Sequence, residues 1–317
     1  MARAEIDAFA QALAGDVRAG GRGDATLAAV RARYGNVHYR IANIRRVRER
    51  AHAVYDAPRA PRFTPARAER AAARAHSARA LAAKQRAVVE IDAEAARMLL
   101  AQARRALAHP AKVDVLDTFA ALALVTGRRA TEIVRTGVFR AVKTPTSARA
   151  AATPRCVHHA HFTGQLKMRD VDIARHLRVT PAARDPRTDG FIIPLLAPCD
   201  EVTRGVARVR AFFGAHTRVS NADANARTHR FAARAAARVR RHAPFVRRFH
   251  DLRTVYAHFT FVLQPEGERA AMHAHLRDTL GHAFGRAALA TGLHYANAWV
   301  GARAQLALAE TCARARA

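Results

Sequence analysis

Lysine and acidic residues are scarce in this chain of 317 residues. It has four lysines (Lys84, Lys112, Lys143 and Lys167) against fifty arginines, and its 25 Asp and Glu residues leave a formal net charge of +29. GC-rich coding also produces much Ala and Arg, but the charge acts in the folded protein whatever its origin. An excess spread along the whole length favours a polyanionic partner, most commonly nucleic acid. Lysine can release a proton in catalysis and arginine cannot. A lysine in a chain that otherwise uses arginine is therefore a candidate acid.

Other features that the chain lacks exclude further classes of protein. No apolar run approaches the roughly 20 residues of a membrane helix. Its three cysteines, Cys156, Cys199 and Cys312, form no Cys-x-x-Cys pair, which indicates reduced thiols rather than disulfides. The His158–His161 run lacks acidic partners nearby, so a zinc site is not favoured. The sequence therefore predicts an intracellular protein with no membrane segment and no metal.

Helical patterns dominate the chain, with one interruption by strands. Aromatic residues are only 6%, and alanine leads the apolar residues, which favours closely packed helices. We expect helices through residues 1–109, an apolar helix over 113–125, and helices again from residue 200. Short β-prone runs bounded by turn residues lie at 138–142, 156–162 and 191–196. The predicted fold is therefore mainly α with a small antiparallel β-sheet (α+β).

Four segments in the second half of the chain hold residues suited to attack on a phosphodiester by a tyrosine. They are Thr126–Glu132, Phe162–Lys167, His250–Arg253 and Leu280–His282, and Tyr295 follows them. Arginine side chains can neutralise the non-bridging phosphate oxygens as charge develops. An imidazole can hold or receive a proton near neutral pH, and a phenol can attack phosphorus and remain linked to it. This chemistry needs no metal, so we expect no cofactor.

These segments resemble the tyrosine recombinase superfamily and, most closely, its hairpin-forming branch, the telomere resolvases (protelomerases). Family members have patterns similar to T-G-x-R-x-x-E, F-x-G-Q-L-K, [HK]-x-x-R and L-G-H. The Thr-Gly-Arg-Arg and Phe-Thr-Gly-Gln-Leu-Lys runs are similar to the resolvases in particular. The resemblance implies a tyrosine recombinase-like catalytic domain over residues 110–317. It also implies a helical core-binding region over residues 1–109 that clamps DNA.

The resemblance implies a role for each site residue. Arg129 and Arg253 would hold the scissile phosphate. Glu132 lies one helical turn from Arg129 and would orient the Arg129 side chain. His250 would share a helix face with Arg253 and act as base or phosphate ligand, while His282 would bond the same phosphate. The remaining residues expected to support the site or to contact DNA are Asp251, Arg128, Arg169, Arg234, Arg238 and Arg241.

The acid and the nucleophile are the two roles with departures from the family pattern. Lys167 would protonate the leaving 5′ oxygen, but Lys143 is a rival because it lies nearer to Arg129 in the sequence. Tyr295 would be the nucleophile, although its distance from His282 along the chain is longer than in family members. An insertion that lengthens the segment carrying Tyr295 would account for the difference.

The function that the resemblance implies is DNA breaking and rejoining through a 3′-phosphotyrosyl intermediate. Two protomers would cut an inverted-repeat site in double-stranded DNA and close each end as a hairpin telomere. The alternatives are a conventional tyrosine integrase or site-specific recombinase, and a non-catalytic DNA-binding relative. We expect a homodimer on DNA, without membrane contact, from a virus or plasmid. It would work in a bacterial cytoplasm or nucleoid, or in a host nucleus.

Overall fold

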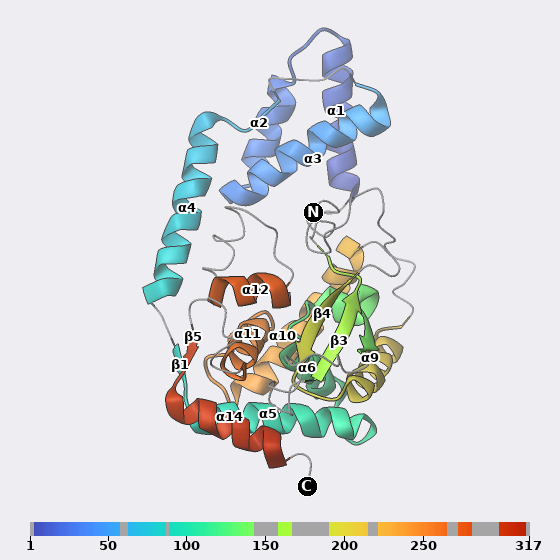
Figure 1. The fold of residues 1–317 in the computed structure, drawn as a ribbon. Coiled ribbons are helices and arrows are strands. Elements are labelled where there is room, and N and C mark those ends of the chain that lie inside the picture. Colours follow the sequence, from blue (N-terminus) through green and yellow to red (C-terminus); the bar gives the residue numbers. More distant parts are fainter. Residues whose placement is uncertain are drawn as a thin grey trace. The chain divides into compact units, whose positions relative to one another are not determined.

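The computed structural model describes residues 3–57, 63–86, 89–142, 158–166, 190–214, 221–264, 272–280 and 298–314. The chain divides into two compact units, Met1–Ala83 and Lys84–Ala317 (Figure 1). Among the described residues, no helix combines the length and the hydrophobicity that crossing a membrane requires.

The first unit is a set of helices around one apolar cluster. Its helices are α1 (Arg3–Arg18), α2 (Asp24–Arg33), α3 (Val37–Tyr55) and most of α4 (Arg67–Arg86). Helix α3 begins where the Asn36 side chain accepts hydrogen bonds from the backbone of His38 and Tyr39, at 3.0 and 3.3 Å. The apolar faces of α1, α2 and α3 meet in a cluster that includes Leu13, Val30, Ile44, Val47 and Phe63.

The second unit contains the remaining elements. Its helices are α5 (Ala93–Ala108), α6 (Val115–Thr126), α9 (Cys199–Phe213), α10 (Asn221–Arg240), α11 (Asp251–Val262), α12 (Met272–Leu280) and α14 (Ala302–Arg314), with short turns η1 (Pro110–Lys112) and η2 (Glu132–Thr136). Its strands are β1 (Val89–Ile91), β2 (Val138–Ala141), β3 (His158–Thr163), β4 (Phe191–Leu195) and β5 (Ala298–Val300). The predicted mainly α fold with a small antiparallel sheet is confirmed.

Helix α6 is the centre of this unit. It is apolar on all sides, is buried from Thr118 to Thr126, and packs against α5, α9, α10 and α11. Gly127 ends the helix in the left-handed conformation, at φ 63°, where a glycine carries no steric cost. A Cβ atom on Gly127 would lie 2.2 Å from the ring of Tyr256, so the turn also depends on close packing. This turn sets the direction in which the next two arginines leave α6.

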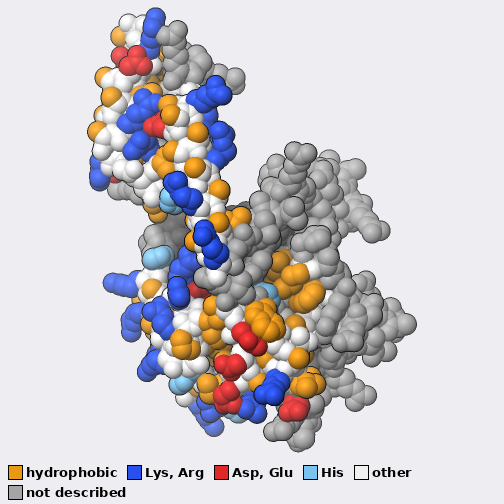
Figure 2. Space-filling view, turned by 90° about the vertical axis from the view of Figure 1, so that its left-hand side faces the viewer, with side chains coloured by type: hydrophobic (Ala, Val, Ile, Leu, Met, Phe, Trp, Pro, Cys, Tyr) orange, Lys and Arg blue, Asp and Glu red, His pale blue; other side chains and the backbone are white. Residues whose placement is uncertain are grey.

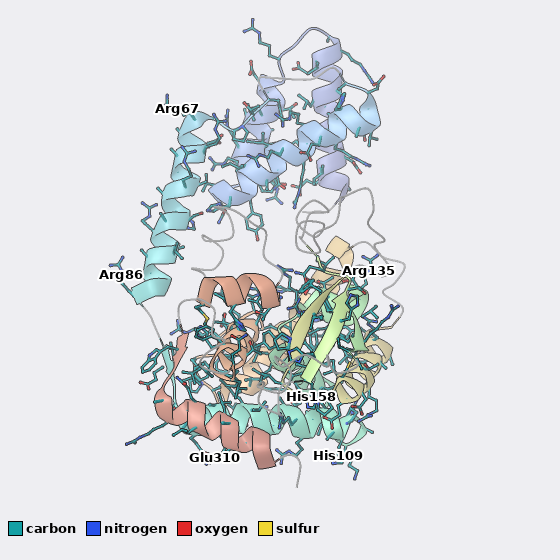
Figure 3. The ribbon with its side chains drawn as sticks, viewed as in Figure 1. Arg67, Arg86, His109, Arg135, His158 and Glu310 are labelled. Atoms are coloured by element: carbon teal, nitrogen blue, oxygen red, sulfur yellow. The ribbon has the colours of Figure 1, made fainter. Side chains whose placement is uncertain are left out.

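Strands β2, β3 and β4 form an antiparallel sheet in that order. Phe162 of β3 lies opposite Phe139 and Phe191 in the register, and the three rings pack with centroids 5.1 and 5.9 Å apart. Arg135 and His158 mark opposite ends of the sheet in Figure 3, so β3 runs toward the η2 end. The turn after β3 therefore lies next to Glu132.

Two features of the second unit differ from the sequence-based expectation. The units divide between Ala83 and Lys84, earlier than the expected boundary at 109/110. Helix α5 belongs to the second unit because its apolar face packs against α6 and α14. In addition, β1 and β5 form a parallel pair that links the two ends of the unit. Three-residue strands are too short to show a periodic pattern, so the sequence did not predict this pair.

Candidate active site

Glu132 is the centre of a buried network of hydrogen bonds and ion pairs. Its side chain is fully buried and lies at the start of η2, a π-helical turn that begins three residues after Arg129. Its carboxylate pairs with the guanidinium of Arg129 at 2.6 Å and with that of Arg253 at 3.9 Å. Burial alone would raise the pKa of Glu132, but the charges of Arg129 and Arg253 outweigh burial and lower it. One ionised carboxylate therefore joins the two arginines assigned to the phosphate.

The two arginines differ in exposure. Arg129 keeps about a fifth of its side chain exposed and also donates from Nη1 to the Leu166 carbonyl at 2.8 Å. Arg253 is 1% exposed, and its guanidinium donates to the carbonyls of Gly127 and, at 2.6 Å, Leu280. Arg129 is thus the more open of the two to a ligand, whereas Arg253 is buried against main-chain acceptors.

The turn after β3 is anchored to the same network. Gly164 has a left-handed φ of 84°, and its carbonyl accepts a hydrogen bond from the Thr136 hydroxyl at 2.6 Å. A Cβ atom at Gly164 would overlap the Thr136 carbonyl oxygen, which explains the glycine. The backbone N–H of Leu166 donates to Glu132 Oε1 at 3.1 Å. The residue that precedes Lys167 is therefore fixed against both Glu132 and Arg129.

Arg128 does not fit the expected DNA contact. It is 1% exposed, and its guanidinium lies over the rings of Phe162 and Phe191, 4.7 and 5.7 Å from their centroids. Burial lowers the pKa of Arg128 to about 10, with a further contribution from the charge of Arg253, so it remains protonated at neutral pH. The turn at Gly127 directs Arg128 into the protein and Arg129 toward the open side.

His250 and Asp251 lie at the start of α11. His250 precedes the helix and is exposed, whereas Arg253, one turn later, is buried, so the two side chains differ in their surroundings. Asp251 accepts hydrogen bonds from the backbone N–H groups of Arg247 and Arg248, at 2.9 and 2.8 Å. Asp251 therefore holds the turn that leads into α11 and presents His250 at its end.

The three arginines expected to contact DNA on and after α10 have different surroundings. Arg234 and Arg241 are exposed. Arg238 instead pairs with Asp114 at 2.6 Å and with Asp117 at 3.1 Å, and so joins α10 to the start of α6. Two carboxylates balance the charge of Arg238, which leaves its guanidinium less available to DNA than those of Arg234 and Arg241.

The remaining predicted site residues, Lys167, Arg169, His282 and Tyr295, and the rival Lys143, lie outside the described residues. Two of them follow closely on residues of the network described above. Leu166 directly precedes Lys167, and Leu280 ends α12 two residues before His282. In the part of the chain that the structure describes, no group of three or more His, Cys, Asp and Glu side chains could hold a metal ion.

Residues 89–297 match the family model described as the telomere resolvase ResT/TelK catalytic domain. This match covers more than half of the chain. The chain belongs to the telomere resolvase family. The family assignment confirms the sequence-based prediction of a DNA breaking and rejoining enzyme that forms hairpin telomeres, and it does not favour the conventional integrase.

Solved structures of telomere resolvases share the fold. A protelomerase TelA variant covalently complexed with substrate DNA has a TM-score of 0.67 and 18% identity, over 87% of this chain and 81% of that one. Another TelA variant, complexed with a DNA hairpin product, has a TM-score of 0.66 and 19% identity, over 90% and 84%. Protelomerase TelK complexed with substrate DNA has a TM-score of 0.54 and 18% identity, over 94% and 59%. No curated protein sequence matches this telomere resolvase.

Proposed function

We propose that this resolvase attacks the scissile phosphate with Tyr295 while Arg129 and Arg253 bind the phosphate. The observation that carries the proposal is the single buried carboxylate of Glu132, which pairs with both arginines. Two guanidiniums fixed in this way are preorganised for a phosphate whose charge develops between them. Preorganisation matters because the groups need no reorientation at the moment of reaction.

The chemistry balances without a cofactor. The Tyr295 oxygen forms a bond to phosphorus as the bond to the 5′ oxygen breaks, and the Lys167 ammonium gives its proton to that oxygen. His282 and His250 bond the phosphate or hold the proton that leaves the phenol. The free 5′ hydroxyl of one strand then bonds to the phosphorus of the opposite strand's phosphotyrosine and gives its proton to the now neutral Lys167. The bond from phosphorus to the Tyr295 oxygen breaks, and the phenol takes back the proton that the histidine held. The energy of the broken bond is kept in the covalent link throughout.

The second unit has one tyrosine besides Tyr295, and the burial of that residue, Tyr256, supports Tyr295 as the nucleophile. Tyr256 is fully buried, and its hydroxyl donates to the Pro194 carbonyl at 2.6 Å. Burial raises the pKa of Tyr256, which makes its phenolate harder to form. The other tyrosines, Tyr34, Tyr39 and Tyr55, belong to the first unit.

The proposal requires one local change at Arg253. Its Nη2 atom donates to the Leu280 carbonyl at the end of α12. A phosphate oxygen must therefore replace that carbonyl as the acceptor when DNA binds. The exchange would couple substrate binding to the position of the chain that carries His282.

Double-stranded DNA with an inverted repeat is the proposed substrate, bound inside the cell by a homodimer. The net charge of +29 supports binding to DNA, and Lys and Arg side chains are spread over the visible surface of each unit in Figure 2. In the first unit, the exposed arginines of α3 and α4 suit a clamp on the phosphate backbone; they include Arg45, Arg46, Arg74 and Arg79. Arg234 and Arg241 offer similar contacts in the second unit.

The covalent intermediate provides the test of the nucleophile. A duplex with a nick just 3′ of the cut site would lose the short fragment that carries the new 5′ hydroxyl, which traps the protein on DNA, and peptide mapping would locate the modified tyrosine. We expect the adduct on Tyr295, its loss in Tyr295→Phe, and its retention in the matched variant Tyr256→Phe. An adduct that persists in Tyr295→Phe would disprove the assignment.

A further inference from the structure

The Arg128 side chain lies beside the proposed catalytic groups, yet its guanidinium faces protein. Its Nε atom donates to the Thr126 carbonyl at 3.0 Å, and its Nη1 atom donates to Gln165 Oε1 at 3.0 Å. Its Nη2 atom donates to the Thr279 carbonyl in α12. The planar fork thus reaches three segments at once: the end of α6, the turn after β3, and the end of α12. A lysine at this position could not match these three directions.

Gln165 extends the connection. Its amide oxygen accepts from Arg128, and its amide nitrogen donates to the Leu280 carbonyl at 3.2 Å. Gln165 lies two residues before Lys167, and it is half-buried in the turn that follows β3. The side chain of Gln165 therefore sets the orientation of this turn relative to α12.

Besides the hydrogen bond from Thr136 to Gly164, two separate anchors hold the residues just before Lys167. The main chain of Leu166 is held by Glu132 and Arg129, and the side chain of Gln165 is held by Arg128. Together they fix both the position and the direction of the turn, as the placement of a proton donor requires.

We propose that Arg128 is a positioning residue that acts through Gln165 to aim the turn carrying Lys167 at the leaving 5′ oxygen. The inference rests on the proposed role of Lys167 as the acid. It predicts that loss of the Arg128–Gln165 contact slows cleavage when the leaving 5′ oxygen needs a proton, while phosphate binding is retained and a leaving group that needs no proton departs at close to the wild-type rate.

The experiment compares two DNA substrates in single-turnover cleavage. One has the normal 5′ oxygen at the scissile phosphate, and the other has a bridging 5′ sulfur. A thiolate leaves without a proton because thiols are far more acidic than alcohols. We expect Arg128→Lys and Gln165→Ala to cleave the oxygen substrate about 10²-fold more slowly than wild type, as for a misplaced catalytic group. On the sulfur substrate both should approach the wild-type rate.

Matched variants distinguish misplacement of the proton donor from a general loss of stability. Arg104→Lys alters an arginine that donates to the Leu196 carbonyl at 2.9 Å, outside the Arg128–Gln165 contact, and should cleave both substrates like wild type. If Arg128→Lys melts below the assay temperature, Gln165→Ala carries the test. Slow cleavage of both substrates by folded Arg128→Lys or by Gln165→Ala would overturn the inference.

Variants of Lys167 and Lys143 show whether the positioning role of Arg128 or the choice of Lys167 as the acid is at fault. Lys167→Ala should be slow on the oxygen substrate and restored by sulfur. If it is restored but Gln165→Ala is not, the positioning role alone is wrong. If sulfur restores Lys143→Ala instead of Lys167→Ala, the acid was misassigned, and the inference falls with it.

Discussion

Replacement of Glu132 by Gln should disrupt both the stability and the chemistry of this resolvase. The substitution keeps the volume but removes the buried charge that balances Arg129 and Arg253, and it places an amide donor among guanidinium donors. Removing one partner of a buried ion pair costs about 3–5 kcal/mol. That is a large part of the roughly 5–15 kcal/mol by which domains are stable, so the variant should fold but unfold at much lower urea.

The cleavage rate should fall further than stability alone explains. Glu132→Gln removes the charge that joins Arg129 to Arg253 and weakens the hold on the Leu166 backbone, and a misplacement of about 1 Å can cost about 10²-fold in rate. Single-turnover cleavage well below the unfolding transition measures this effect in the folded protein.

An exposed pair with the same spacing provides the control. Glu94 pairs with Arg97, three residues away, but about half or more of each side chain is exposed. Glu94→Gln should therefore change the free energy of unfolding by less than about 1 kcal/mol and leave cleavage intact. Equal effects of Glu132→Gln and Glu94→Gln would refute the central role given to the buried carboxylate.

Three further predictions follow from the second unit. Gly127→Ala should cost at least about 2 kcal/mol in urea unfolding, because it adds backbone strain and a contact 2.2 Å from the Tyr256 ring. The lowered pKa of Glu132 stabilises the fold above about pH 4.5, and this stability is lost as the pH falls below that value; the loss should be absent in Glu132→Gln. Arg241→Ala should weaken DNA binding and reduce its salt dependence by about one ion, whereas Arg238→Ala should mainly lower the melting temperature.

The sequence predicted the parts of the fold whose signals are local. The apolar run that became α6 and the three β-prone runs before and after the Gly164 turn are each readable within a few residues. The likeness of four short motifs then indicated the family, which the family model confirms. The pairing of Arg129 with Glu132 was also predictable, since residues three apart on a helical turn are neighbours.

Other features depend on contacts between distant segments. Arg128 and Arg129 have the same chemistry, and only the turn at Gly127 and the rings of Phe162 and Phe191 decide that Arg128 points inward. Likewise, the pattern of α5 shows that one face is buried but not which helices cover it. The role of Arg128 therefore could not be read from its motif.

Hairpin formation is tested most directly by a denaturing gel of an inverted-repeat duplex, incubated with the protein in EDTA. We predict two products, each a single closed strand that renatures at once to a hairpin, and no such products with Tyr295→Phe. Exchanged duplexes or four-way junctions would contradict hairpin formation, as would hairpins that still form without the Tyr295 hydroxyl.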